Sequence, residues 1–146
     1  LSGAWMWLKK KPSSIEFGLA KVMNSIFPSF TQNNKIDVTA LSSIEQVGVD
    51  YQNDPLVHPK ISVGLFMDFY PAGLEAIENA SELTTPTLLI HGEDDRIVDS
   101  KGSEEFAKRA VDVAEVRIYS ETRHELHNDI RALEILEGVV EWLNDK

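Results

Sequence analysis

Two stretches decide the fold of this chain: TLLIHGEDDRIV at residues 87–98, and VRIY at residues 116–119, which leads into RHELHND at residues 123–129. Each begins as an apolar run, typical of a strand buried on both faces, and ends in a polar loop. The first loop presents a carboxylate at Asp95, and the second presents an imidazole at His124. Because the carboxyl ends of parallel strands share one edge of a sheet, we expect the two side chains to meet there.

An acid and then a histidine, each after its own strand, is the order of the last two members of a Ser-Asp-His triad. In a triad Asp95 accepts a hydrogen bond from Nδ1–H of His124 and fixes its tautomer, and His124 is the general base. The alternative for the acid is that Asp94, Asp95 or Asp99 caps the following helix. The alternative for His124 is a surface loop. The shared sheet edge favours the triad.

The chain has no Gly-x-Ser-x-Gly turn, the motif that carries the nucleophile of such a triad. Its serines lack the flanking residues of that turn, as is seen at Ser2, Ser42, Ser43, Ser100 and Ser103. We therefore expect the nucleophile and the oxyanion-hole donors to lie upstream. The chain alone is then expected not to hydrolyse esters.

Helical patterns surround the two strands. The first helix begins at a capping box formed by Ser13 and Glu16. Pro71 and Gly73 are expected to kink or split a longer helix. The expected helices cover residues 14–27, 38–41, 43–51, 59–83, 103–111 and 128–144, and the expected strands cover 87–91 and 115–119. The last helix has one apolar stripe, made of Ile130, Leu133, Leu136, Val140 and Leu143.

This order of elements predicts an α/β fold with parallel strands and right-handed crossovers. We expect residues 1–58 to form a helical cap or lid, and residues 59–146 to form the C-terminal part of the core. Residues 1–4 read as the end of another strand. Two strands alone leave unpaired edges, so we expect a missing N-terminal half of the same polypeptide, or a homodimer partner, to complete the sheet.

The charge is uneven along the chain. Residues 1–35 hold five lysines and one glutamate, whereas residues 36–146 hold nine basic and 23 acidic side chains. An acidic body of this kind excludes a nucleic-acid partner. The apolar runs are too short for an integral membrane segment. The absence of cysteine is typical of a reducing compartment, so we expect a cytoplasmic protein.

The other histidines have less specific roles. His127 is expected to orient the loop, His91 to pack and bond to the backbone, and His58 to lie between cap and helix. A zinc site would need a spacing such as His-Glu-x-x-His, which the HELH of residues 124–127 does not match. Because no phosphate-binding glycine loop is present either, we expect neither a metal nor a cofactor.

An aromatic cluster at residues 5–8 lies beside three lysines. It is expected to anchor the first helix. The alternative is that it forms an apolar wall of an acyl-chain pocket, with Trp5, Trp7 and Phe27 as the candidate substrate-binding residues.

Four segments also carry a family resemblance. The HGEDDRIV of residues 91–98 and the RHELHND of residues 123–129 resemble the acid and histidine motifs of serine hydrolases of the monoacylglycerol lipase and lysophospholipase-like branch. The NDPLVH of residues 53–58 resembles the return from that family's cap to its core, and LSGA of residues 1–4 resembles the strand end from which the cap departs. By position, Asp95 matches the triad acid and His124 the base.

The resemblance implies an α/β-hydrolase fold and cleavage of a carboxylic ester, lipid-like in character, such as a monoacylglycerol or a lysophospholipid. No cofactor is implied. Three other activities occur on the same fold and stay open: carbon–carbon bond hydrolysis, a proline-type aminopeptidase and a haloperoxidase-like esterase. A non-catalytic binding module is the rival from another class.

Overall fold

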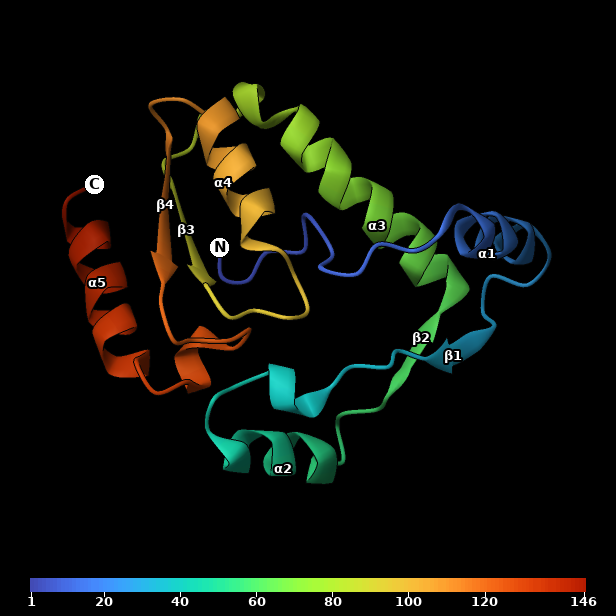
Figure 1. Cartoon of the computed structure of the whole chain (residues 1–146). Coiled ribbons are helices and arrows are strands. Elements are labelled where there is room, and N and C mark those ends of the chain that lie inside the picture. The colour runs from blue at the N-terminus through green and yellow to red at the C-terminus, as the bar shows by residue number, and fades with distance from the viewer.

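A computed structural model describes all 146 residues. Its centre is a parallel pair of strands, β3 (Thr87–Gly92) and β4 (Ala114–Tyr119). The helix that joins them, α4 (Ser100–Arg109), lies on one side of the pair, and α5 (Ala132–Asn144) lies on the other (Figure 1). The parallel α/β core expected from the sequence is confirmed.

The first residues of the chain extend this sheet. Ser2 forms a parallel bridge with Ile90, and the Gly3 amide donates to the Ile90 carbonyl at 3.1 Å. Leu8 then forms an antiparallel bridge with Val98, just beyond Asp95. Residues 1–8 therefore contact the core, although the expected boundary at residue 58 assigns them to the cap. That boundary stays a prediction.

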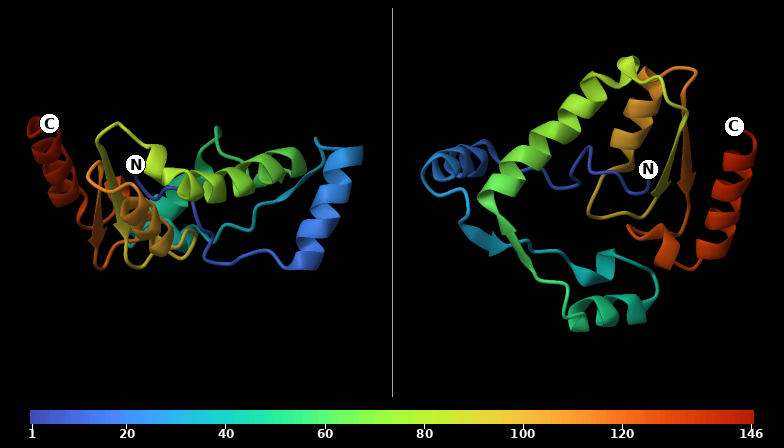
Figure 2. Two further views of the ribbon diagram at one scale, coloured as in Figure 1. Left: turned by 90° about the horizontal axis from the view of Figure 1, so that it is seen from above. Right: turned by 180° about the vertical axis from the view of Figure 1, so that it is seen from behind.

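The elements between α1 and β2, most of which lie in the expected cap, form an arc around the core (Figure 2). The helix α1 (Ser14–Ile26) begins with the expected capping box. A 3₁₀ turn, η1 (Val38–Ala40), and the helix α2 (Glu45–Asn53) follow, and they lie beside the segment after β4 (Figure 1).

The structure differs from the sequence-based expectation in two segments. Strands were expected only at 87–91 and 115–119, but β1 (Thr31–Asn33) pairs antiparallel with β2 (Lys60–Ser62), within the first residues of the expected helix 59–83. The helix α3 (Val63–Glu78) continues through Pro71 and Gly73, so of the expected kink or split, the split does not occur. A short 3₁₀ turn, η2 (Ala80–Glu82), follows it and leads toward β3.

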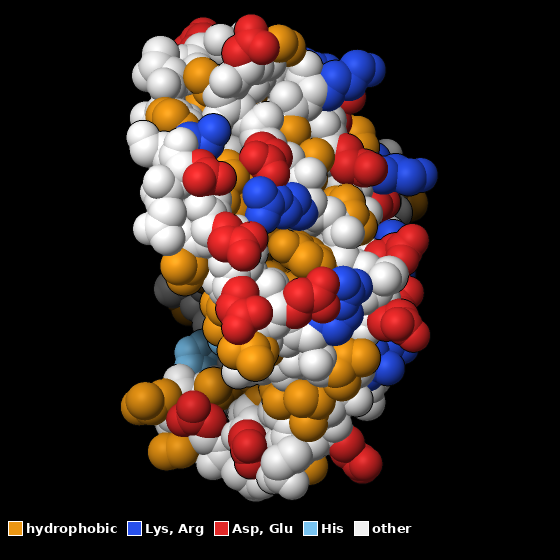
Figure 3. Space-filling view, turned by 90° about the vertical axis from the view of Figure 1, so that its left-hand side faces the viewer, with side chains coloured by type: hydrophobic (Ala, Val, Ile, Leu, Met, Phe, Trp, Pro, Cys, Tyr) orange, Lys and Arg blue, Asp and Glu red, His pale blue; other side chains and the backbone are white.

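The face that α5 buries is not the apolar stripe seen in its sequence. Its buried residues are Ile135 and Trp142, whereas the residues of the stripe are exposed. Figure 3 shows the side of the molecule on which α5 lies, where apolar and charged side chains are interspersed. The exposed stripe consists of Leu133, Leu136, Val140 and Leu143. The helical period therefore identified the helix but not the face that packs on the sheet.

The apolar interior has two parts. A buried cluster fills the space between the sheet, α3 and α4; it contains Met6, Ile77, Ala80, Leu89, Phe106 and Ala110. On the α5 side an apolar hollow of about 530 Å³ is lined by residues of β3 and α5, among them Leu88, Ile90 and Trp142. No helix of the chain has both the length and the apolar character needed to cross a membrane.

Candidate active site

Asp95 lies in the turn after β3 and is held by the backbone of that turn. Its side chain is 1% exposed. Oδ1 accepts hydrogen bonds from the amides of Ile97 at 2.8 Å and Val98 at 2.9 Å. The helix-capping alternative belongs to a different residue: Asp99 is the N-cap of α4 and accepts from the Lys101 amide at 3.3 Å. Asp95 is therefore free to use its second oxygen elsewhere.

That second oxygen meets His124. Asp95 Oδ2 lies 2.8 Å from Nδ1 of His124, within the range of a working acid–histidine hydrogen bond. His124 follows β4 and its side chain is 25% exposed, whereas the carboxylate is almost fully buried. The two candidate catalytic residues thus meet at the carboxyl edge of the parallel strands, in the geometry of a triad acid and base.

The pair changes both ionisation equilibria. Burial by itself raises the pKa of Asp95, but the hydrogen bond from His124, the contact with His91 and the Val98 amide together hold that pKa far below its usual range. The hydrogen bond to Asp95 raises the pKa of His124, and burial of the ring opposes this only in part. The site therefore stabilises an imidazolium, which is the charge that a general base carries after it takes a proton.

A second histidine, His91, lies on the buried side of Asp95. His91 is fully buried, and its Nε2 is 3.2 Å from Asp95 Oδ2 without making an aligned hydrogen bond. Its Nδ1 lies 2.9 Å from the Ser103 hydroxyl, which is also buried. The sequence predicted a packed histidine, and the packing is confirmed. Its ring partners are a hydroxyl and a carboxylate, however, and not the backbone.

Two glycines let the loops approach closely. A Cβ at Gly92 would collide with the carbonyl oxygens of Arg123 and Thr122, so only glycine lets the acid loop cross the histidine loop here. Gly3 has φ +49°, and a Cβ on it would lie 3.2 Å from Nδ1 of His124. The His124 ring therefore rests against backbone from the N-terminal segment.

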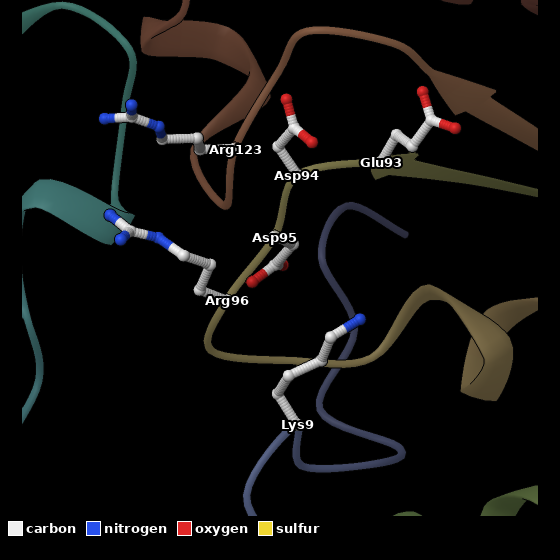
Figure 4. Close-up of a pocket in the computed structure, with 6 residues that line it drawn as sticks. All are labelled: Lys9, Glu93, Asp94, Asp95, Arg96 and Arg123. Carbon is white, nitrogen blue, oxygen red and sulfur yellow. The ribbon is translucent and has the colours of Figure 1, made fainter.

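A charged cavity of about 390 Å³ lies beside Asp95; its lining is Lys9, Glu93, Asp94, Asp95, Arg96 and Arg123. Figure 4 shows that Arg96 and Arg123 point away from the Asp95 carboxylate, toward the segment around η1. Arg123 Nη1 donates to the Thr39 carbonyl at 2.6 Å, and Arg96 Nη2 donates to the Thr39 hydroxyl at 2.9 Å. Neither arginine was predicted to belong to the site, although each is a chain neighbour of a candidate catalytic residue.

The candidate substrate-binding residues lie outside this cavity. Trp5 packs edge-on against Phe69, with the ring centroids 5.7 Å apart. Trp7 packs against the buried cluster, and Phe27 is half-exposed in the cap. A role for Trp5, Trp7 and Phe27 in binding stays a prediction. His127 and His58 are exposed, and no three acidic or histidine side chains are grouped as metal ligands would be.

Comparison with known proteins places this geometry in a family. The family described as serine aminopeptidase, S33, matches residues 1–131. The chain belongs to this family. Among curated members of similar sequence, an uncharacterized abhydrolase domain-containing protein of Dictyostelium discoideum is 30% identical over 93% of the chain, which covers 15% of that protein. The monoacylglycerol lipase of Mycolicibacterium smegmatis is 29% identical over 90% of the chain, which covers 47% of the lipase.

A solved structure shows the same fold. The crystal structure of Paleococcus ferrophilus monoacylglycerol lipase superposes with a TM-score of 0.91 at 29% identity, over 97% of this chain and 56% of that one. The fold is therefore that of the α/β-hydrolases, in the branch that contains monoacylglycerol lipases. The chain spans about half the length of the monoacylglycerol lipases it matches.

Proposed function

We propose that the protein containing this chain is a serine hydrolase of carboxylic esters, with His124 as its general base and Asp95 as the acid that orients it. The observation that carries the proposal is the 2.8 Å hydrogen bond between Asp95 Oδ2 and His124 Nδ1. Two further observations support the proposal: the carboxylate of Asp95 is buried and held by backbone amides, and the pKa of His124 is raised. The site lies at the carboxyl edge of the strands, where this fold presents its catalytic groups.

The roles follow from the hydrogen bonding. With Nδ1–H donated to Asp95, the tautomer of His124 leaves the Nε2 lone pair free to accept a proton. In the proposed reaction a serine hydroxyl, supplied by an upstream segment, loses its proton to Nε2 as its oxygen attacks the ester carbonyl. The imidazolium then returns that proton to the leaving alcohol. A water molecule releases the acyl group through the same base.

The proposed substrate is a lipid-like ester, a monoacylglycerol or a lysophospholipid. The names of the relatives favour this class, since two similar proteins are monoacylglycerol lipases. The description of the matching family as a serine aminopeptidase favours peptide amides as the second candidate. To distinguish the two substrate classes, turnover of monoacylglycerols, lysophospholipids and aminoacyl-arylamides is compared in one enzyme preparation. Preferential cleavage of the arylamides would exclude the lipid-ester proposal.

The triad assignment is tested in the longest natural polypeptide that contains these 146 residues. His124→Ala is expected to lower kcat for ester hydrolysis by roughly three or more orders of magnitude, and Asp95→Asn by roughly 10⁴-fold, with folding intact. His58→Ala is the matched control, because His58 is an exposed histidine of the cap. Wild-type turnover by the His124 variant would refute the assignment.

We also propose what completes the core. The exposed stripe of α5 and the hollow beside β3 are apolar surfaces of the kind that folded proteins cover. The monoacylglycerol lipases among the relatives are about twice as long as this chain. The proposed cover is therefore further polypeptide of the same protein, which would also supply the serine, and a homodimer partner is the alternative.

A further inference from the structure

The loop that carries His124 is held by one short piece of the cap. Four successive carbonyl oxygens, those of residues 39–42, accept hydrogen bonds from residues 123–125. The His124 amide donates to Ala40 at 3.4 Å, and the Glu125 amide donates to Leu41 at 2.7 Å. We call residues 39–42 the Thr39–Ser42 turn. Three of its four residues are buried, whereas Thr39 and the hydrogen bond from Arg123 to its carbonyl are exposed.

Arg123 closes the two ends of this turn. A single atom, Nη1, donates to the Thr39 carbonyl at 2.6 Å and to the Ser42 carbonyl at 2.7 Å. These are charge-assisted bonds, which are stronger than those between neutral groups. The guanidinium therefore fixes the curvature of the turn, and the turn in turn fixes the His124 backbone.

The same turn is tied to the acid loop and to the far end of the histidine loop. Arg96, the residue after Asp95, donates to the Thr39 hydroxyl at 2.9 Å. The Ser42 hydroxyl donates to the Asn128 carbonyl at 2.7 Å, and the buried Asp129 accepts from the amides of Ser43, directly after the turn, at 3.1 Å and Arg123 at 2.7 Å. One cap segment thus contacts both loops whose side chains must meet within hydrogen-bond distance.

We propose that Arg123 is a positioning residue: through the Thr39–Ser42 turn it holds the His124 loop in register with the Asp95 loop, so that the cap sets the catalytic geometry. This rests on the proposed function of His124. Without Arg123 the two carbonyls lose their shared donor, the turn relaxes, and the imidazole moves relative to a carboxylate that its own turn keeps in place. A displacement of about 1 Å in a catalytic group lowers turnover by about 100-fold.

A spectroscopic readout separates positioning from charge. The charged neighbours that raise the pKa of His124 are Asp95 and Glu125, and Arg123 is not among them. If Arg123 positions the loop, Arg123→Gln weakens the Asp95 bond, and the pKa of His124 falls. If Arg123 acted by charge alone, removing a cation would leave that pKa unchanged or raise it. A decrease in the pKa of His124 is therefore expected only if Arg123 positions the loop.

The experiment uses the longest natural polypeptide that contains these residues. NMR titration gives the pKa of the His124 ring in wild type, Arg123→Gln and Arg123→Lys. The matched control is Arg109→Gln, since Arg109 pairs only with Glu105 on its own helix. We expect a lowered pKa in Arg123→Gln, a smaller decrease in Arg123→Lys, whose shorter side chain reaches one carbonyl, and none in the control. Ester turnover in Arg123→Gln is expected to fall by about 100-fold with KM little changed.

Thermal unfolding of each variant shows whether it folds. Should Arg123→Gln not fold, the smaller decrease in Arg123→Lys decides. An unshifted or raised His124 pKa in the folded variants overturns the proposal, even if stability is lower. The titration needs no activity, so a protein without esterase activity whose His124 pKa responds as expected would refute the proposed function and leave the positioning role standing.

Discussion

Asp95 is the central residue of the site, and buried residues on its other side help to hold it in place. The buried His91 contacts the carboxylate from beneath, and Ser103 on α4 is the hydrogen-bond partner of that histidine. These residues are buried in an otherwise apolar layer, where an unpaired polar group is costly. Ser103 therefore contributes to the site although it touches neither the acid nor the base that the substrate would meet.

Replacing Ser103 with alanine is expected to lower the free energy of unfolding by about 1–3 kcal/mol, because it leaves His91 Nδ1 buried without a partner. Urea denaturation measures the change. Ser25→Ala is the control, since Ser25 is exposed and bonds only within α1 at the Lys21 carbonyl; its effect is expected to stay within about 0.5 kcal/mol. Equal losses in the two variants would mean that the Ser103–His91 bond contributes nothing.

The pH dependence of activity is also set by single residues. The base must be neutral to accept a proton, and the bond to Asp95 raises the pKa of His124. The acid limb of the kcat/KM profile is therefore expected above the ordinary histidine pKa of about 6.5. Asp95→Asn removes the carboxylate, so the residual activity is expected to have its acid limb shifted to lower pH. If the acid limb of the Asp95→Asn profile does not shift, His124 is not the group that takes the proton in the rate-limiting step.

At the scale of elements, the parts that the sequence predicted are those with a local signal. The two strands, the helix between them and the meeting of Asp95 with His124 follow from apolar runs and from the shared edge of parallel strands. The strand β1 carries no such signal, because it has three residues and all of them are exposed. Its existence depends on a partner, β2, that lies far along the chain.

The contacts of Arg96 and Arg123 were not predictable for the same reason. Both arginines stand in polar loops, where an exposed cation is the ordinary expectation. What gives them a role is the Thr39–Ser42 turn, more than fifty residues upstream of the nearer one. For α5, the period of the apolar residues indicates an amphipathic helix, but a helix with apolar residues on two sides does not reveal which side the sheet covers.

The N-terminal segment provides a test at this scale. Gly3→Ala places a Cβ 3.2 Å from the His124 ring at a residue whose φ is +49°. We expect the ring to be displaced, the pKa of His124 to fall and ester turnover to decrease. Gly18→Ala is the matched control, because nothing lies within 4 Å of its Cβ position and α1 is expected to gain about 0.5–1 kcal/mol from it. Normal turnover in Gly3→Ala would show that the ring has room to move.

At the scale of the whole molecule, the outer face of α5 is an apolar surface that nothing in these 146 residues covers. Leu133, Val140 and Leu143 are each more than half exposed on one stripe, next to the hollow beside β3. We expect the 146 residues alone to self-associate, and a longer natural polypeptide that contains them to be monomeric. Size-exclusion chromatography with light scattering measures both. A soluble monomer of 146 residues would contradict the proposal that further polypeptide covers this face.

A substitution sharpens that comparison. Leu133→Glu and Val140→Glu in the 146-residue chain are expected to reduce self-association, because they interrupt the apolar stripe. Glu137→Gln is the control on the same helix, at an exposed position. If the control reduces association as much as the stripe variants, the stripe is not the surface through which the chain associates.

The pairing of residues 1–3 with β3 also has a consequence during synthesis. The Gly3 amide donates to the Ile90 carbonyl, 87 positions along the chain. At a translation speed of about 5–20 residues per second, the first residues wait roughly 4–17 s for their partner strand to be made. The segment that waits includes Trp5, Met6 and Trp7, which the finished fold packs against α3 and α4. A nascent chain of this protein is therefore expected to expose an apolar stretch with two tryptophans for seconds before the helices that cover it have been made.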